Sequence, residues 1–369
     1  MVESAARYAC APARTTLSAV DDFRMFQGRA LDLLGLGPQQ HPSRVLLATP
    51  AFRVRSYAPI PNSAPPVLLV AAPIKRAYIW DLMPQVSTVR LLIEAGFAVH
   101  LLEWLDQERS REDLGLDTYA NVFIDEAVKA IKQDSGNAPL LVGHSLGGTL
   151  AAIFCALHPE SARGIVLLEA PLHFGADAGA FAPVVAASAD AHLLHAAFSV
   201  VPGSFLDLVS AAAAPRTFVL ERYLDLITSL GRPSLQVHLR VARWSMDEFA
   251  IPGRLFAEVV EDLYRKDRFM RGDLTLGHRR IGPGSLVVPM LNVANPDNTV
   301  IPPSSIVAFH RAAASPVKEL LWYNGDQGVA LQHVGVLVGH TARIRLWPQI
   351  IAWIRNLNWP ERSEEASTE

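Results

Sequence analysis

The sequence predicts an α/β fold in which a mostly parallel sheet is covered by helices on both faces. Through the first 170 residues, apolar runs of strand length alternate with longer segments of helical composition, which is the pattern of strand–helix–strand units. Several of these runs, such as VLLVAA at 67–72, are apolar throughout, as strands buried on both faces are. A third observation is a glycine-rich turn, GHSLG at 143–147, between one such run and an apolar helix.

Eight segments are expected to form the sheet, and the first two should open it as an antiparallel pair. The predicted strands are 45–48, 52–57, 67–72, 97–103, 138–142, 164–169, 286–293 and 319–323. The predicted helices are 20–34, 85–95, 118–133, 149–157, 304–314 and 346–357. Gly35 should end the first of these helices, because glycine is favoured at the position just past a helix end.

The alternation of strands and helices is interrupted between Ala170 and Ser285. This stretch of 116 residues is far longer than the dozen or so that a crossover between parallel strands needs. It is rich in Ala, Leu, Phe and Val, so we expect a mainly helical cap over the carboxyl ends of the strands. The predicted organisation is an N-terminal extension (1–42), a first part of the core (43–170), the cap (171–285), a second part of the core (286–358) and a flexible tail (359–369).

The composition narrows the possible functions. Basic and acidic residues number 33 and 36, with a formal net charge of −3, which argues against nucleic acid as a main partner. The two cysteines encode no disulfide framework, so a reducing compartment, the cytoplasm, is expected. The sequence shows no secretory signal, so export is not predicted. It also has no apolar stretch of about 18 residues, so a membrane span is not predicted. Mean hydropathy is nonetheless +0.20, so either the core is large or apolar surface serves a greasy ligand or partner.

Ser145 is the candidate nucleophile. A G-x-S-x-G sequence between a strand and a helix is the nucleophile elbow of the α/β-hydrolase fold. The turn is too tight for side chains at Gly143 and Gly147, so the serine is lifted above the sheet edge. The first N–H groups of the helix then face any oxyanion formed there. The expected fold is therefore an α/β-hydrolase with a large cap insertion.

A serine hydroxyl needs a base within hydrogen-bond reach, and a carboxylate must orient that base. On this fold the acid and the histidine follow the serine in that order, each on a loop after a strand. Asp297, directly after the 286–293 strand, is the expected acid, and Asp326, on the loop after the next strand, is its competitor. His333, on the loop after the final strand, is the expected base, and His340 is its rival.

The oxyanion hole needs two N–H donors. The backbone of Leu146 should supply one, and the loop after the 67–72 strand should supply the other from Ile74 or Lys75.

The remaining histidines and cysteines point to no further chemistry. His310 is spaced as part of the 304–314 helix and is expected at the surface, Cys155 is expected in the core, and Cys10 is assigned no role. The sequence contains no His/Cys/Asp/Glu cluster with metal-ligand spacing, no phosphate loop and no dinucleotide fingerprint, so no cofactor and no metal are predicted.

Several segments together resemble the polyhydroxyalkanoate synthase family, the short class III kind in particular. They are AYIWDL at 77–82 with Gln85 and Ser87, LDTY at 116–119, RGDL at 271–274 with Gly277 to Ile281, Asn292, Asp297 with VIPP at 300–303, HVG at 333–335, and Trp347, Pro348 and Trp353. The resemblance runs from about residue 45 to 357. It implies Asp297 as acid, His333 as base, (R)-3-hydroxyacyl groups as substrate, and a cap that covers the site and mediates dimerisation. Polymer granules would then be the surface at which the protein works.

One departure from that family matters most. The family's nucleophile is normally cysteine in a G-x-C-x-G box, whereas this chain has Ser145. A thioester keeps the acyl-transfer potential of a CoA donor, while hydrolysis of an acyl-serine is the ordinary second half of an esterase cycle. The leading hypothesis is therefore a serine esterase or depolymerase acting on 3-hydroxyacyl esters, thioesters or polyesters. The alternative is a synthase that polymerises (R)-3-hydroxyacyl-CoA from a serine, and a third hypothesis is a non-enzymatic relative that binds granules or a partner.

Overall fold

The computed structural model describes residues 11–57, 64–106, 113–193 and 198–357. Its main sheet has eight strands in the order β1-β2-β6-β3-β7-β8-β13-β14. Their bounds are Arg44–Ala48 (β1), Phe52–Tyr57 (β2), Pro66–Val70 (β3), Ala98–Trp104 (β6), Leu140–His144 (β7), Ile165–Leu168 (β8), Met290–Ala294 (β13) and Lys318–Trp322 (β14). β2 pairs antiparallel with both β1 and β6, and every other neighbouring pair is parallel. The predicted fold class is confirmed.

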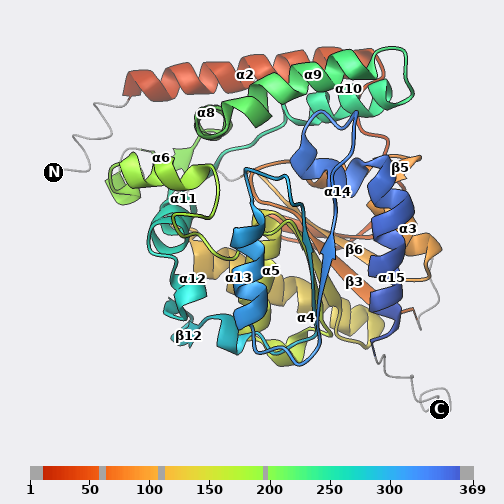
Figure 1. The fold of residues 1–369 in the computed structure, drawn as a ribbon, viewed down its shortest axis with the longest axis vertical. Coiled ribbons are helices and arrows are strands. Elements are labelled where there is room, and N and C mark those ends of the chain that lie inside the picture. Colours follow the sequence, from red (N-terminus) through yellow and green to blue (C-terminus); the bar gives the residue numbers. More distant parts are fainter. Residues whose placement is uncertain (1–10, 58–63, 107–112, 194–197, 358–369) are drawn as a thin grey trace.

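Helices cover both faces of this sheet, so its central strands are buried on both sides. All residues of β3, β7, β8 and β13 are buried. In Figure 1, α3 and α15 lie against one face, and α4, α5 and α13 lie against the other. The core helices are Thr88–Glu94 (α3), Ile124–Ser135 (α4, preceded by the π-helix Thr118–Phe123, η3), Leu146–Leu157 (α5), Pro303–Ala312 (α13), Gly335–Val338 (α14) and Trp347–Arg355 (α15, preceded by Ala342–Leu346, η9). Short 3-10 helices span Ala77–Trp80 (η1), Pro159–Ser161 (η4) and Gln332–Val334 (η8).

The register of the sheet brings three strand ends to one place. Leu168, the last residue of β8, pairs with His144 at the end of β7 and with Val293 near the end of β13. Since parallel strands end at the same edge of a sheet, the residues that follow β7, β8 and β13 lie beside one another. This edge holds the candidate site.

Two element boundaries differ from the sequence expectation for identifiable reasons. The predicted 286–293 strand begins only at Met290, directly after Pro289, which has no N–H to donate to a neighbouring strand. The predicted 85–95 helix begins at Thr88, because residues 86–87 (β5, Val86–Ser87) pair with Asp81–Met83 (β4). Ser87 then caps the helix by accepting a hydrogen bond from the backbone N–H of Arg90.

The insertion between β8 and β13 is mainly helical, as predicted, but only its first part covers the strand ends. Its helices are Phe181–Ala187 (α6), Gly203–Ala213 (α8), Glu221–Ser229 (α9, preceded by Arg216–Leu220, η5), Ser234–Trp244 (α10), Gly253–Glu258 (α11, continued by Val259–Arg265, η6), Arg268–Arg271 (α12) and Pro283–Ser285 (η7). Val200–Val201 (β9) pairs antiparallel with the distant Ile251–Pro252 (β10), and Leu274–Leu276 (β11) forms a small hairpin with Arg279–Ile281 (β12). In Figure 1, α8, α9 and α10 lie above the sheet, whereas α12 and β12 lie beside α5 of the core.

The N-terminal helix α2 (Ala11–Leu33) packs across this cap rather than on the sheet (Figure 1). Arg243 on α10 forms two hydrogen bonds with the Asp32 carboxylate, and Asp21 accepts a hydrogen bond from the backbone N–H of Ser204. Gly35 follows the helix with a φ of 77°, which confirms the predicted end. The start of the helix lies nine residues before the predicted one.

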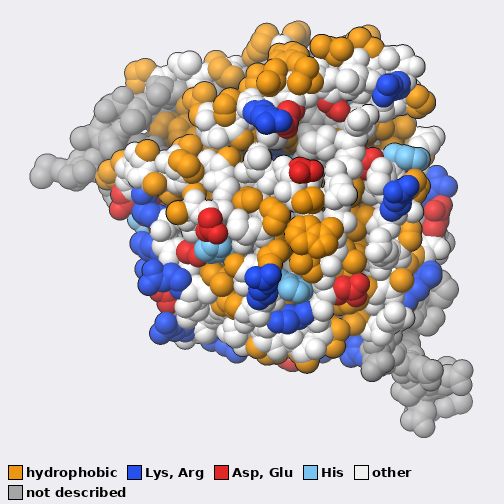
Figure 2. Space-filling model, in the orientation of Figure 1, with side chains coloured by type: hydrophobic (Ala, Val, Ile, Leu, Met, Phe, Trp, Pro, Cys, Tyr) orange, Lys and Arg blue, Asp and Glu red, His pale blue; other side chains and the backbone are white. Residues whose placement is uncertain are grey.

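The high hydropathy is shared between a large core and an apolar outer surface of the cap. Figure 2 shows hydrophobic side chains gathered over the top of the molecule, where α2 and α9 lie. Exposed members of this surface include Phe23, Phe26, Tyr223, Leu224 and Ile227. Within the described residues, no helix combines the length and apolar character that crossing a membrane requires.

The cysteine prediction is confirmed where the structure tests it. Cys155 is fully buried on α5, and burial in an apolar setting raises the pKa of its thiol. Cys10 and the tail 359–369 lie outside the described residues.

Candidate active site

Ser145 lies on the sharp turn between β7 and α5, with φ 54° and ψ −135°. Such a backbone conformation is rare for a residue with a side chain, and it persists only where the surroundings enforce it. The flanking glycines allow the turn. A Cβ atom at Gly143 would overlap the backbone of Gly148, and one at Gly147 would overlap the carbonyl oxygen of Val70. The predicted strand–turn–helix geometry is therefore present.

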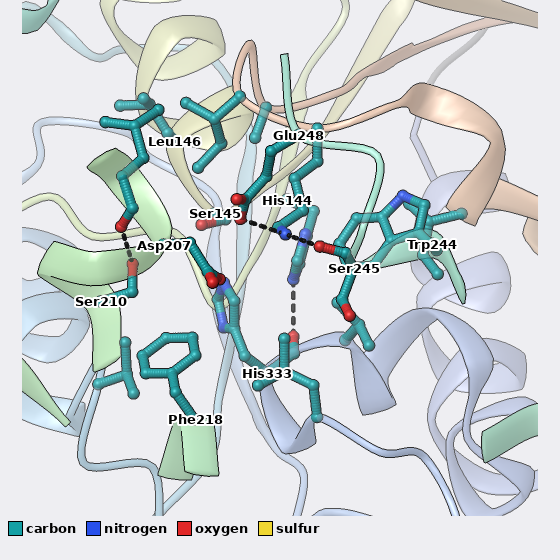
Figure 3. Close-up of a pocket in the computed structure, with 18 of the residues that line it drawn as sticks. His144, Ser145, Leu146, Asp207, Ser210, Phe218, Trp244, Ser245, Glu248 and His333 are labelled. Carbon is teal, nitrogen blue, oxygen red and sulfur yellow. Dashed lines mark hydrogen bonds and ion pairs between the residues drawn. The ribbon is translucent and has the colours of Figure 1, made fainter. Parts of the chain in front are cut away.

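Ser145 opens onto a partly open, mostly apolar pocket of about 200 Å³ between the core and the cap. His333, Leu146, Ile74 and Lys75 line the same pocket, and Figure 3 shows Ser145, Leu146 and His333 around it. Its apolar wall is made of Trp80, Phe181, Phe218, Trp244, Tyr264 and Ile301. The structure thus brings together the serine, the expected base and the expected oxyanion donors.

His333 is the histidine at this pocket, and its two ring nitrogens have different surroundings. Nδ1 lies 3.3 Å from Oε2 of Glu169. Nε2 is buried and, within the described part of the chain, has no hydrogen-bond partner. Burial lowers the pKa of His333 to about 4, so the imidazole is neutral near pH 7. The rival His340 is exposed to solvent on the short segment between α14 and η9.

Glu169 is the carboxylate beside His333, and the sequence analysis did not single it out. It follows β8 directly, has a positive φ of 43° and is completely buried. Asn298 donates a hydrogen bond of 2.5 Å to Oε2, the same oxygen that faces His333. Burial, the largest effect, raises the pKa of Glu169 to about 7, against the opposing influence of His144 and the Asn298 hydrogen bond.

Neither of the two aspartates weighed as the acid forms a hydrogen bond or ion pair with His333 among the described residues, so the geometry gives no support to the expectation for Asp297. Asp297 is exposed and lines an open polar cleft of about 1040 Å³ on the far side of His333. Asp326 has a structural role instead. Its carboxylate accepts hydrogen bonds from the Tyr323 hydroxyl and from the backbone N–H groups of Thr341 and Ala342.

His310 lies on α13 as predicted, but it is half-buried rather than on the surface. Its Nδ1 lies 3.0 Å from the amide nitrogen of Asn292 on β13. Burial, together with the nearby Lys318 and Arg311 charges, lowers its pKa. It is a structural contact between helix and sheet.

His144, the residue before the nucleophile, supports the histidine loop. Its Nε2 donates a hydrogen bond of 2.8 Å to the backbone oxygen of His333, and the two imidazole rings lie 4.5 Å apart. Burial lowers the pKa of His144 to about 3, so the ring remains neutral and keeps this donor. The bond connects the loop that carries His333 to the residue next to Ser145. No feature of the sequence predicted this bond.

The expected oxyanion donors border the pocket that Ser145 opens onto. Leu146 is the first residue of α5, and the first N–H groups of a helix have no partner inside it. Ile74 and Lys75 lie on the loop after β3, on the wall of the pocket. Which of these two amides faces the oxyanion stays a prediction. Across the described residues, no group of three or more His, Cys, Asp or Glu side chains could hold a metal ion.

The sheet order, the elbow and the loop positions define an α/β-hydrolase. A family model described as the alpha/beta hydrolase fold matches residues 75–199. Two solved structures share the fold. A soluble variant of monoglyceride lipase from Saccharomyces cerevisiae superposes with a TM-score of 0.52, 12% identity, and coverage of 88% of this chain and 98% of that one. An esterase from Rhodococcus sp. gives 0.50, 16% identity, and coverage of 86% and 99%.

Within that superfamily the chain is a relative of the poly(3-hydroxyalkanoate) polymerase subunits, which confirms the resemblance found in the sequence. The PhaC subunit of Haloferax mediterranei is 29% identical over 82% of this chain and 60% of its own length. The PhaC subunit of Allochromatium vinosum is 26% identical over 80% of this chain and 82% of its own length. The chain spans about 60% of the length of the two haloarchaeal relatives that it matches.

Proposed function

We propose that the protein is a serine hydrolase that cleaves esters, thioesters or polyesters of 3-hydroxyacyl groups through an acyl-Ser145 intermediate. The observation that carries the proposal is the division of roles at His333. One ring nitrogen faces the buried carboxylate of Glu169, and the other is buried without a partner in the pocket that Ser145 opens onto. This is the arrangement that a histidine base needs before substrate binds.

The reaction follows from these positions. His333 Nε2 takes the proton of the Ser145 hydroxyl as its oxygen attacks the ester carbonyl. Glu169 accepts the Nδ1–H bond and stabilises the imidazolium, and the backbone N–H groups of Leu146 and of Ile74 or Lys75 stabilise the oxyanion. When the tetrahedral intermediate collapses, the leaving alcohol or thiol receives the proton from His333. Water then attacks the acyl-serine and gives a proton to His333. His333 returns that proton to the Ser145 oxygen as the hydroxy acid leaves.

The pocket favours short acyl groups. Its volume of about 200 Å³ is below the roughly 300–1,000 Å³ of pockets that enclose drug-sized ligands. Its wall is largely apolar, with aromatic residues from both the core and the cap, such as Trp80 and Phe218. We therefore propose short 3-hydroxyacyl chains, of the 3-hydroxybutyryl size, as the acyl part of the substrate.

Product analysis with 3-hydroxybutyryl-CoA tests the proposal. Free 3-hydroxybutyrate and labelling of Ser145 by a fluorophosphonate are expected from the wild type. The Ser145→Ala variant should lose both, with turnover falling on the order of 10⁶-fold. Ser304→Ala, which removes a serine on α13 outside the pocket, is the matched control and should behave as the wild type. Residual turnover of Ser145→Ala above a few thousandths of the wild type would exclude Ser145 as nucleophile.

A second candidate function is polymerisation, and the comparisons favour it, because the relatives are named poly(3-hydroxyalkanoate) polymerases. On this chain the growing polyester would rest on a serine ester, which is a less activated acyl donor than a thioester. The same incubation separates the two functions: polymer that accumulates from 3-hydroxybutyryl-CoA would replace hydrolysis with polymerisation as the function of this site. A Ser145→Cys variant that gains polymer at the expense of free acid would trace the difference to the nucleophile.

A further inference from the structure

The loop that should supply the second oxyanion donor, residues 73–76, is held by the cap as well as by the core. At its start, Trp104 on β6 donates a hydrogen bond of 2.7 Å to the backbone oxygen of Ala71. Further along, Arg76 pairs with Asp106, just after β6, and several other partners of the loop lie in residues 243–249, at the end of α10 and just after it. We call these residues the cap clamp. Lys75 and Glu248 form an isolated antiparallel β-bridge between loop and clamp.

The Lys75 side chain adds three contacts to the same segment. Its ammonium forms an ion pair with Glu248 and donates a hydrogen bond of 3.0 Å to the backbone oxygen of Ser245. It also lies 5.2 Å from the ring centroid of Trp244, within the range of a cation–π interaction. The two charged side chains are only 15% and 7% exposed. Glu248 also pairs with Arg24 on α2 at 2.9 Å, so without Lys75 it would keep a cationic partner but lose its link to the loop.

The neighbours of Lys75 are held by the clamp too. Trp244 donates a hydrogen bond of 2.7 Å from its indole N–H to the backbone oxygen of Arg76. The Tyr78 hydroxyl donates one of 2.6 Å to Asp247, which also pairs with Arg243 on α10. Lys75, Arg76 and Tyr78 thus connect to the clamp through backbone pairing, an ion pair and side-chain hydrogen bonds. Figure 3 shows Trp244, Ser245 and Glu248 beside the pocket that contains Ser145.

We propose that the cap clamp positions the second oxyanion donor, with Lys75 as the positioning residue, so that the oxyanion hole is complete only when the cap is seated on this loop. The proposal rests on the hydrolase function proposed above. An oxyanion donor works only within about 2.7–3.1 Å of the developing charge, and losing one costs roughly 10²–10³ in kcat. A loop freed from the clamp would lose that distance while the acyl pocket, built mainly by other residues, still binds the ground state.

The Lys75→Met variant tests this directly, since methionine keeps most of the side-chain length but removes the ion pair and the hydrogen bond. We expect kcat on a 3-hydroxybutyryl ester to fall roughly 30- to 300-fold, with KM changed less than threefold. Affinity for a trifluoromethyl ketone, which forms an oxyanion on Ser145, should fall in parallel with kcat/KM. Affinity for the product 3-hydroxybutyrate should stay within threefold. Arg254→Met, which breaks the Arg254–Glu258 ion pair on α11 away from the loop, should change none of these.

Hydrogen–deuterium exchange of the amides of residues 73–78 gives a readout that needs no activity. Exchange there should rise at least tenfold in Lys75→Met and remain at the wild-type rate in Arg254→Met. Unchanged exchange in Lys75→Met, or equal losses of ketone and product affinity, would overturn the role of the clamp. A wild type that neither turns over nor forms the ketone adduct would instead overturn the proposed function, while the exchange result still decides whether the clamp holds the loop.

Discussion

Glu169 and Asp297 follow adjacent strands of one sheet, yet their surroundings have little in common. Glu169 comes directly after β8, is completely buried and lies 3.3 Å from Nδ1 of His333. Asp297 comes three residues after β13, is exposed, and lines the polar cleft behind the histidine. Asn298, the next residue of the β13 loop, is buried and donates its hydrogen bond to Glu169. The end of β8 therefore supplies the carboxylate that faces His333, and the β13 loop supplies an amide that hydrogen-bonds to that carboxylate.

This difference teaches that side-chain direction and burial decide which carboxylate lies beside His333. The β7, β8 and β13 ends lie side by side, so a carboxylate after either β8 or β13 is close enough to serve. The positive φ of Glu169 turns its side chain into the site. Asn298 holds the loop beneath it, because its side-chain oxygen accepts hydrogen bonds from the N–H groups of Val300 and Ile301.

The largest expected effect separates the two carboxylates. Glu169→Gln keeps the size of the side chain but removes the charge that stabilises the imidazolium, so kcat should fall on the order of 10³–10⁴-fold. Asp297→Asn, the matched control on the neighbouring loop, should change kcat less than threefold because its carboxylate is exposed. Steady-state kinetics on one short-chain ester compares them. A severe Asp297→Asn variant with a mild Glu169→Gln variant would return the acid role to the β13 loop.

The sequence could predict that Ser145 and His333 line one pocket, because backbone rules govern the position of both. Ser145 is fixed by glycines that the turn requires, and His333 by its place after the last strand. The position of Glu169 beside His333 could not be predicted in this way, because it depends on which side chain is buried. Glu169 stood in the sequence as the last residue of an apolar run, and the predicted strand 164–169 included it. The strand ends one residue earlier, at Leu168, which frees Glu169 to turn into the site.

The contacts between the cap and the loop after β3 could not be predicted from the sequence for another reason. The bonds of Lys75 and Tyr78 to Ser245 and Asp247 join residues about 170 positions apart. Helix periodicity predicts that the insertion is helical, but it does not give the direction in which α10 ends. The mostly helical cap was therefore predictable, and its hold on the loop after β3 was not.

The pH dependence of kcat/KM provides the next test of the Glu169 assignment. The carboxylate must be ionised to accept the Nδ1–H bond, and burial raises the pKa of Glu169 to about 7. Since Glu169 and His333 interact, the pair takes up one proton with an apparent pKa near that value. Activity should therefore rise with pH through about 7 and fall about tenfold per pH unit below it, to roughly one hundredth of its plateau at pH 5.

The Glu169→Gln variant is the control for that profile. Without the glutamate, the acid limb should move down toward the pKa of His333, which burial lowers to about 4, on top of a much lower plateau. Asp297→Asn should leave the wild-type limb in place. A limb that is identical in the wild type and in Glu169→Gln would mean that another group controls it.

The smallest effect sharpens the comparison most, because it asks whether the acid can be moved from one strand end to the other. In Glu169→Gln combined with Asn298→Asp, the new carboxylate would replace the amide that now lies 2.5 Å from Oε2 of Glu169. One of its oxygens can keep the two backbone bonds of the β13 loop, and the other would face the side of His333 that Glu169 now serves. We expect the double variant to recover at least tenfold in kcat over Glu169→Gln.

Asn298→Asp alone should lose activity at neutral pH, because two buried carboxylates side by side raise each other's pKa. The sign of the coupling in this double-mutant cycle decides the matter. Losses that simply add would mean that residue 298 only supports the loop and that the site accepts its acid from the end of β8 alone.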